Sequence, residues 1–149
     1  MLDRFLEAQN CVVYGELSQF ETAKKELEGG EKLSHWMWYV FPQIRGLGQS
    51  DFAIKYGIAN IKEATEYYNN GVLGTRLEEL VRIVNQIKNK SAEEIFGHID
   101  AMKFLSCLTL FHEVAPENQT FNDAINKYYD GKLDDKTLKI LEKQKLFIS

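Results

Sequence analysis

Apolar side chains recur along most of the chain at spacings of three and four residues, the period of an amphipathic helix. The longest periodic run is Val72–Asn89, which places five leucine and valine side chains and Ile87 on one face. The run His98–Ala115 is apolar on nearly every side, and Pro116 stops it. A helix without a polar face is normally buried, so we expect His98–Ala115 to be the central and most buried helix.

Capping residues and glycines divide the remaining chain into further helices. We expect the first to start at Asp3, carry Phe5, Leu6, Val12 and Val13 and break near Gly15, and the second to be Ser18–Glu28. Three more follow, namely a short helix capped by Ser34 through Trp36 to Phe41, one capped by Ser50 through Tyr56, and Asn60–Asn69. The remaining three are one capped by Ser91 and ending near Gly97, one opened by Thr120 with Asp123 and closed by Gly131, and a last one capped by Asp134 or Asp135. The prediction is an all-α fold in which residues 1–149 form one compact domain, a bundle of seven to nine short-to-medium helices.

One segment leaves two structures open. Trp36, Trp38 and Val40 alternate with other residues, which is typical of a strand. Ser34 and Pro42 instead bracket a short helix, because serine favours the N-cap and proline forbids continuation. We favour the helix because no partner strand is visible elsewhere in the sequence.

Composition narrows the class of protein. The 44% apolar and 27% charged residues are ordinary for a globular domain. A net charge of −4 argues against a nucleic-acid-binding surface. Met1–Gln9 lacks the apolar core of a signal peptide, and no apolar run reaches the roughly 18 residues of a membrane span. Cys11 and Cys107 lack CxxC spacing and are typical of reduced thiols, so we expect a cytoplasmic protein with no membrane segment.

The stretch Lys32–Ser50 concentrates the side chains that most often build a small-molecule pocket. It holds both tryptophans, Trp36 and Trp38, whose flat rings can stack on a ligand. Three polar side chains accompany them: Lys32, His35 and Gln43. The alternative is that the aromatic rings are simply core, which is the commoner fate of such clusters.

A second polar set lies on the His98–Ala115 helix. Asp100, Lys103 and Cys107 share one face, and Ser106 lies beside them. Either Asp100 and Lys103 form an ion pair of their own near the helix start, or they form a polar strip that faces Lys32–Ser50 across a cleft.

Arg76 is a third candidate, because an arginine in the first turns of a helix can hold a phosphate or carboxylate. The alternative is a surface pair with Glu78 or Glu79. The segment GLGQSD lacks the last glycine of a dinucleotide-binding motif, and the three histidines lack metal-ligand spacing. We therefore predict neither a cofactor nor a metal.

The string K-x-x-HWMW-x-x-FPQ-x-x-GLG-x-S at Lys32–Ser50 resembles the signature of a family of small bacterial proteins, domain-of-unknown-function family 1810, whose members sometimes carry the misleading label calpastatin. The resemblance continues through LG-x-RL at 73–77, FG-x-x-D-x-x-K-x-x-S-x-x-TLF at 96–111 and G-x-x-D-x-x-T-L at 131–138. It implies a compact, mainly helical fold and no particular activity. Between Gln9 and Phe20 the chain is about seven residues longer than the family pattern, roughly two helical turns, so we expect a longer helix or a reshaped loop there.

The matching strings include polar residues from distant segments, and a shared cleft is the economical explanation. We predict an enzyme or a ligand-binding protein, with one polar–aromatic cleft for a small anionic, nucleotide-like ligand. The candidate acid, base and charge-stabilising residues are His35, Asp100 and Lys103, and the candidate ligand contacts are Lys32, Trp36, Trp38, Gln43, Arg76 and Ser106. The geometric form of the prediction is that His35 and Lys103 lie on one cavity.

Two alternatives stay open. The Trp36–Phe41 segment could be an exposed aromatic surface for a partner peptide or a second copy of the chain, in a non-catalytic interaction module. Both segments could also be structural core alone. The sequence leaves the oligomeric state open.

Overall fold

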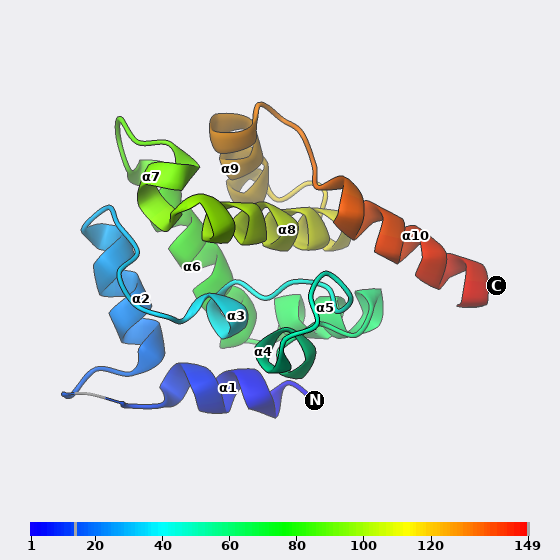
Figure 1. Cartoon of the computed structure of the whole chain (residues 1–149), viewed down its shortest axis with the longest axis horizontal. Coiled ribbons are helices and arrows are strands. Elements are labelled where there is room, and N and C mark those ends of the chain that lie inside the picture. The colour runs from blue at the N-terminus through cyan, green and yellow to red at the C-terminus, as the bar shows by residue number, and fades with distance from the viewer. Residues whose placement is uncertain (14, 149) are drawn as a thin grey trace.

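A computed structural model describes residues 1–13 and 15–148, the last two by their backbone alone, and shows ten α-helices and no strand among them (Figure 1). The helices are α1 (Asp3–Asn10), α2 (Gln19–Glu28), α3 (Met37–Val40), α4 (Asp51–Lys55), α5 (Ile61–Asn69), α6 (Leu73–Gln86), α7 (Ala92–Phe96), α8 (His98–Val114), α9 (Gln119–Tyr129) and α10 (Asp135–Ile148). Seven of them have eight residues or more, so the all-α prediction is confirmed, with short helices bringing the total above the expected seven to nine. None of the described helices is long and apolar enough to cross a membrane.

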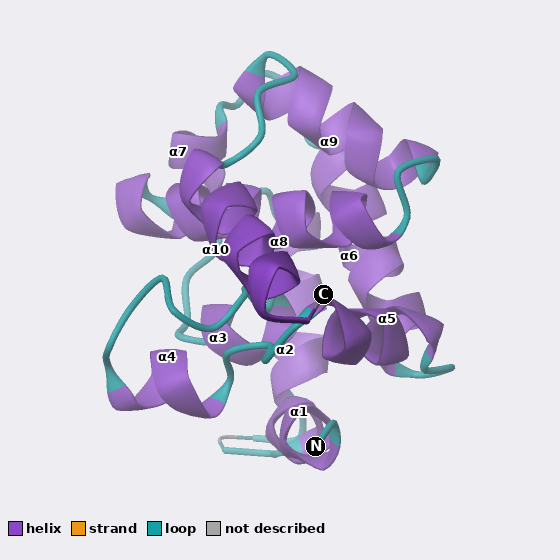
Figure 2. Cartoon of the chain, turned by 90° about the vertical axis from the view of Figure 1, so that its right-hand side faces the viewer, coloured by secondary structure: helices purple, strands orange, loops and turns teal. Residues whose placement is uncertain are grey.

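Helix α8 is the centre of the fold. It runs across the middle of Figure 1 and contacts α5, α7, α9 and α10. Its buried side chains point in several directions, and they are Ala101, Phe104, Ser106, Cys107, Leu108, Thr109, Leu110 and Phe111. The prediction that the helix without a polar face is the central one is confirmed. The other helices surround it, as the turned view in Figure 2 shows.

Aromatic rings join α8 to the segment around α3. The Phe41 ring meets the Phe104 ring edge to face, with centroids 4.9 Å apart, and meets Phe96 at 6.0 Å. Trp36 lies 6.0 Å from Phe41, and both side chains are fully buried. Such edge-to-face pairs add to the free energy gained from burial alone. They fix α3 and the residues after it against the first half of α8.

Helix starts are set by side-chain caps, and the sequence identifies most of them. Ser18, Ser50, Asn60 and Ser91 accept the expected backbone hydrogen bonds at the starts of α2, α4, α5 and α7. The choice between Asp134 and Asp135 falls on Asp134, whose Oδ2 accepts from the Thr137 N–H at 3.1 Å.

Two predicted helix starts are wrong, whereas helix α1 begins at Asp3 as predicted, with Leu2 at its N-cap position. The start of α9 is capped by Asn118, whose side chain accepts from the Phe121 N–H, two residues before the predicted Thr120. Helix α3 begins only after Trp36, because Ser34 bonds to Glu26 instead of capping it. The helix at this segment is nevertheless confirmed over the alternative strand.

Two helices are shorter than predicted. Helix α1 ends at Asn10, and Val12 and Val13 are 52% and 53% exposed in a loop that the Gln19 N–H closes by donating to the Cys11 carbonyl at 2.9 Å. Of the two structures expected between Gln9 and Phe20, the described residues show a loop rather than a longer helix, and Tyr14 lies outside them. Helix α6 ends at Gln86, since Ile87 is already extended.

The loop after α3 is held by backbone pairing rather than by a helix. Ile44 and Ile58 form an isolated parallel bridge, in which the Ile58 N–H donates to the Gln43 carbonyl at 2.8 Å. Gly57 is required beside it, because a Cβ there would lie 2.7 Å from the Ala53 carbonyl oxygen and 2.8 Å from the Arg45 Cβ. Arg45 also donates to the Gly57 carbonyl at 3.0 Å. The position of Gln43 is thus fixed by its main chain.

A partly buried ion pair ties the N-terminus to this loop. Arg4 donates to both Glu63 oxygens, at 2.9 and 3.1 Å, and to the Gly57 carbonyl at 2.9 Å. Burial alone raises the pKa of Glu63, but the Arg4 hydrogen bonds and charge and the Ala59 N–H outweigh it and lower the pKa to about 2, from an ordinary value of 4.5.

We predict that Glu63→Gln makes the fold less stable at neutral pH and its stability less dependent on pH in the acid range. A carboxylate whose folded-state pKa lies below its unfolded-state value stabilises the protein above pH 4.5, and that stabilisation is lost as the pH falls toward 2. Glu63→Gln should therefore lower the free energy of unfolding by about 2 kcal/mol at neutral pH and flatten its decline between those pH values. Denaturant unfolding at several pH values measures both. Glu113→Gln, on an exposed carboxylate, is the control; equal losses in the two variants would refute the prediction.

Candidate functional site

The Glu26 carboxylate orders the segment that leads into α3. It accepts hydrogen bonds from the Leu33 and Ser34 N–H groups at 2.8 and 2.9 Å, from the Ser34 hydroxyl at 2.5 Å and from the Trp36 indole N–H at 2.9 Å. Burial alone would raise the pKa of Glu26, but these hydrogen bonds lower it below its ordinary value. The carboxylate is therefore ionised. Because it accepts from the indole N–H, the Trp36 ring can be buried without an unpaired polar group.

Lys32 is turned inward by this arrangement. Its ammonium lies 5.0 Å from the centre of the Trp36 ring and 2.8 Å from Asp100 Oδ2. Only 7% of the Lys32 side chain and 19% of the Asp100 side chain are exposed, so the ion pair is largely shielded from solvent. A buried ammonium needs such a partner, because an unpaired charge in the interior is costly.

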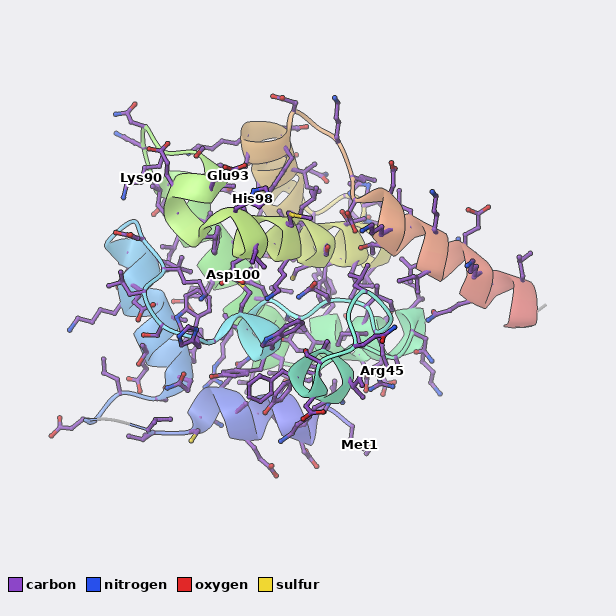
Figure 3. The ribbon with its side chains drawn as sticks, in the orientation of Figure 1. Met1, Arg45, Lys90, Glu93, His98 and Asp100 are labelled. Carbon is purple, nitrogen blue, oxygen red and sulfur yellow. The ribbon has the colours of Figure 1, made fainter. Side chains whose placement is uncertain are left out.

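Asp100 connects Lys32 to Lys103. Its second oxygen lies 3.3 Å from the Lys103 ammonium, and Lys103 lies 4.1 Å from the centre of the Trp38 ring. The Asp100–Lys103 pair that the sequence offered as an alternative does form, but it shares its carboxylate with Lys32. Two cations and one anion leave a net positive charge on the side of α8 that faces α3, where Figure 3 shows Asp100.

A cavity of about 340 Å³ opens beside this charge cluster. Its walls come from α3 and the following loop, from α4, from α8 and from the start of α10. The apolar side chains that line it are Trp38, Ile44, Leu47, Ala53, Tyr56, Ile99 and Met102, and the polar ones are Gln43, Lys103, Ser106, Asp134 and Lys136. Its volume lies in the range of small-molecule sites, which are typically apolar with a few polar groups.

The Gln43 side chain stands out among the polar groups. The residue is 7% exposed, and its Nε2 is buried without a hydrogen-bond partner in the described part of the chain. The other buried glutamine, Gln9, donates to the Tyr39 carbonyl at 2.8 Å and to the Tyr67 hydroxyl at 3.1 Å and accepts from Arg76 at 3.1 Å. Buried side-chain amides normally have hydrogen-bond partners, as Gln9 does. Gln43 therefore carries unused hydrogen-bonding capacity in the wall of the cavity.

Asp134 and Ser106 form the opposite polar corner. The Ser106 hydroxyl lies 3.2 Å from Asp134 Oδ2, and the Thr137 hydroxyl and N–H donate to the same oxygen at 2.6 and 3.1 Å. The Asp134 N–H donates to the Thr109 hydroxyl at 2.9 Å. From the sequence we predicted Asp134 only as a helix cap, although it is the aspartate of the G-x-x-D-x-x-T-L string. No motif or spacing in the sequence pointed to Lys136 as a cavity residue.

The structure brings together some of the predicted site residues. Trp38, Gln43, Lys103 and Ser106 line the cavity, and Lys32 and Asp100 lie behind Lys103. Trp36 is part of the core.

His35 and Arg76 lie elsewhere. His35 is exposed in the loop before α3 and is not among the residues that line the cavity with Lys103. Arg76 donates to Gln9 and lies 4.6 Å from the centre of the Phe20 ring. It therefore does not line the cavity, and it does not form the alternative pair with Glu78 or Glu79.

Metal-ligand and thiol chemistry find little support in the described residues. They contain no group of three or more histidine, cysteine, aspartate or glutamate side chains arranged to hold a metal ion. Burial raises the pKa of the Cys107 thiol well above its ordinary value, so the thiol stays protonated. Cys11 is exposed, and both cysteines are free.

Comparison with known proteins gives one family and one solved relative. A family model described as "Protein of unknown function (DUF1810)" matches residues 1–141. Among solved structures, the chain is similar to the conserved hypothetical protein Rv1873 from Mycobacterium tuberculosis, whose crystal structure was determined at 1.38 Å. The two are 42% identical with a TM-score of 0.88, over 95% of this chain and 96% of that one. No curated protein matches. The resemblance stated from the sequence is confirmed, and neither description names an activity.

We predict that Asp100→Ala is strongly destabilising. The substitution leaves the buried Lys32 ammonium without its carboxylate, which should lower the free energy of unfolding by about 3 kcal/mol. Adding Lys32→Met removes the stranded charge and should recover at least half of this loss. Denaturant unfolding of the two single variants and the double variant measures the coupling.

The half-exposed pair Lys24–Glu79, whose side chains are 38% and 36% exposed, is the control. Lys24→Met should change stability by about 0–1 kcal/mol. If Asp100→Ala were no more damaging than Lys24→Met, the Lys32–Asp100 pair would not have the structural role assigned to it.

Proposed function

The chain belongs to the DUF1810 family of proteins of unknown function, and we propose that it binds a small anionic molecule with a flat apolar body in the cavity between α3, α4, α8 and α10. The observation that carries this proposal is the buried, unpartnered Gln43 amide nitrogen in the cavity wall. An unpaired buried donor costs about 1–3 kcal/mol. A ligand acceptor atom would supply the missing partner.

The charge of the cavity favours an anion. Lys103 and Lys136 both line it, and the Asp100 carboxylate behind Lys103 is already paired with Lys32. Asp100 therefore does not fully neutralise Lys103, and the remaining positive charge can attract an anionic ligand. Asp134 is the single lining carboxylate among the described residues, so the lining side chains carry a net positive charge.

The apolar lining favours a flat body of modest size. Tyr56, Leu47 and Met102 offer apolar surface within a cavity of about 340 Å³. The Trp38 ring, which the sequence offered for stacking, faces the Lys103 ammonium at 4.1 Å. Planar ligands of the nucleotide class fit this lining if their ring lies against Tyr56 and Leu47 and their anionic group approaches Lys103.

The interaction-module alternative has less to build on. Trp36 and Phe41 are fully buried, and Met37 and Val40 are each 2% exposed. Trp38 and Tyr39 are only partly exposed, and Trp38 lines the cavity, so the Trp36–Phe41 segment offers little open aromatic surface for a partner. The proposal is one of binding rather than of a specified reaction, because His35 lies away from the cavity and Asp100 is engaged by two lysines.

We predict that Gln43→Leu stabilises the ligand-free protein. Replacing an unpartnered buried amide by an apolar group of similar size removes a desolvation cost, so the free energy of unfolding should rise by about 1 kcal/mol. Gln9→Leu is the matched control, because the same substitution at a fully paired buried amide should lower it by about 2 kcal/mol. Denaturant unfolding of both variants measures the difference. A Gln43→Leu variant as damaged as Gln9→Leu would show that the Gln43 amide has a partner within the fold.

We also predict that a small anion stabilises the wild-type protein against heat. A ligand at 100 times its Kd should raise Tm by roughly 5–10 °C. The panel is inorganic phosphate, AMP, ribose 5-phosphate and an aromatic carboxylate, read by differential scanning fluorimetry. Lys103→Met and Gln43→Leu should each reduce the shift, and His35→Ala, outside the cavity, should leave it unchanged. A folded wild-type protein that no anion stabilises would refute the proposal.

A further inference from the structure

Asp134 lies where the cavity meets a second one. The second cavity, of about 590 Å³, lies on the other side of the first turns of α8 and is lined in part by Tyr128 and Tyr129. Its lining also includes Glu93 and His98, which Figure 3 shows where α7 meets α8. The two cavities share Met102 and Asp134. A ligand in the first cavity that reaches this shared wall therefore meets Asp134.

We propose that Asp134 selects anionic ligands that carry neighbouring hydroxyl groups, as phosphorylated sugars and ribonucleotides do. This inference rests on the proposed function, because it assumes that the anionic end of the ligand lies in the first cavity. It adds a specificity contact at the boundary of the two cavities. The hydroxyl groups donate hydrogen bonds to the Asp134 carboxylate, as the hydroxyls of a ribose do to acidic side chains in other folds.

The Asp134 carboxylate is held ready for this contact. Three donors reach its Oδ2, namely the Ser106 hydroxyl and both the hydroxyl and the N–H of Thr137. No hydrogen bond from the described residues reaches Oδ1. The Asp134 main chain is fixed by Thr109 on α8. The carboxylate thus has one oxygen anchored and the other without a protein donor, so a ligand donor can bind it without a change in the fold.

A hydroxyl group suits this corner better than an ammonium group does. Lys103 and Lys136 line the same cavity as Asp134. Two nearby positive charges offset the single carboxylate, so a cationic donor gains little electrostatic energy there. A neutral hydroxyl escapes that repulsion and still forms a charge-assisted hydrogen bond. The Ser106 hydroxyl, which donates its one hydrogen to the carboxylate, can accept from a second hydroxyl of the same sugar.

The test compares AMP with its 2′,3′-dideoxy analogue by isothermal titration calorimetry. The two share the anionic group and the flat ring, and they differ only in the hydroxyls. We expect the wild-type protein to bind AMP roughly tenfold or more tightly than the analogue. Asp134→Asn should abolish that ratio while retaining the analogue's affinity, because asparagine keeps the cap of α10 and removes the charge.

Asp135→Asn is the matched control, because it removes the same charge one residue further along and does not line either cavity. It should preserve the ratio. If Asp134→Asn fails to fold, Ser106→Ala provides a second variant, and it should reduce the ratio of the two affinities. Equal affinities of AMP and the analogue in the wild-type protein would overturn this inference and leave the proposed function standing. Binding of neither, with no stabilisation by phosphate or ribose 5-phosphate, would overturn both.

Discussion

The hydrogen bonds of the Glu26 carboxylate are the constraint on which the site depends. Four donors from Leu33, Ser34 and Trp36 converge on this one side chain of α2. With the chain held in this turn, the Trp36 ring enters the core and Lys32 points toward Asp100. Asp100 in turn pairs with Lys103, which borders the cavity. A carboxylate on α2 is thus connected to a lysine on α8 through a series of short, mostly buried polar contacts.

The buried polar groups divide into those that stabilise the fold and those that do not. Gln9, Lys32 and Glu63 have their partners inside the protein, and each connects elements that are distant in sequence. Gln43 differs, although its backbone is pinned by Ile58 just as firmly. A fold optimised for stability alone would place an apolar residue at that position. Local departures of this kind are expected where function is at stake, because binding sites retain groups that the fold itself does not need.

How much the sequence predicts depends on the range of the interaction concerned. Helix caps at Ser50, Asn60 and Ser91 and the burial of α8 follow from neighbouring residues, so they could be predicted. The role of Glu26 could not, because its partners lie seven to ten residues further on, around a turn whose shape it creates. The placing of His35 failed for a related reason. Being next to a buried tryptophan does not fix which way a loop side chain points, and the main chain turns His35 to solvent. Asp134 meets Ser106 across 28 residues, a distance that only the packing of α10 on α8 closes.

The order of charges around the cavity gives a ligand one orientation. Lys103 belongs to a cluster whose remaining cation and anion, Lys32 and Asp100, neutralise each other, so positive charge is concentrated at the wall formed by α3 and α8. The carboxylate of Asp134 lies at the start of α10, where the second cavity begins. An anionic group placed near Asp134 would meet a like charge that Lys136 only offsets, and the same group placed near Lys103 would meet an opposite one. Under the proposed function, the anionic end of a bipartite ligand would lie against α8, and its hydroxyl-bearing end would lie against α10. Phe41 packs on Phe104 in the first wall and the Thr137 hydroxyl donates to Asp134 in the second, so contacts within the fold already position the groups that this orientation uses.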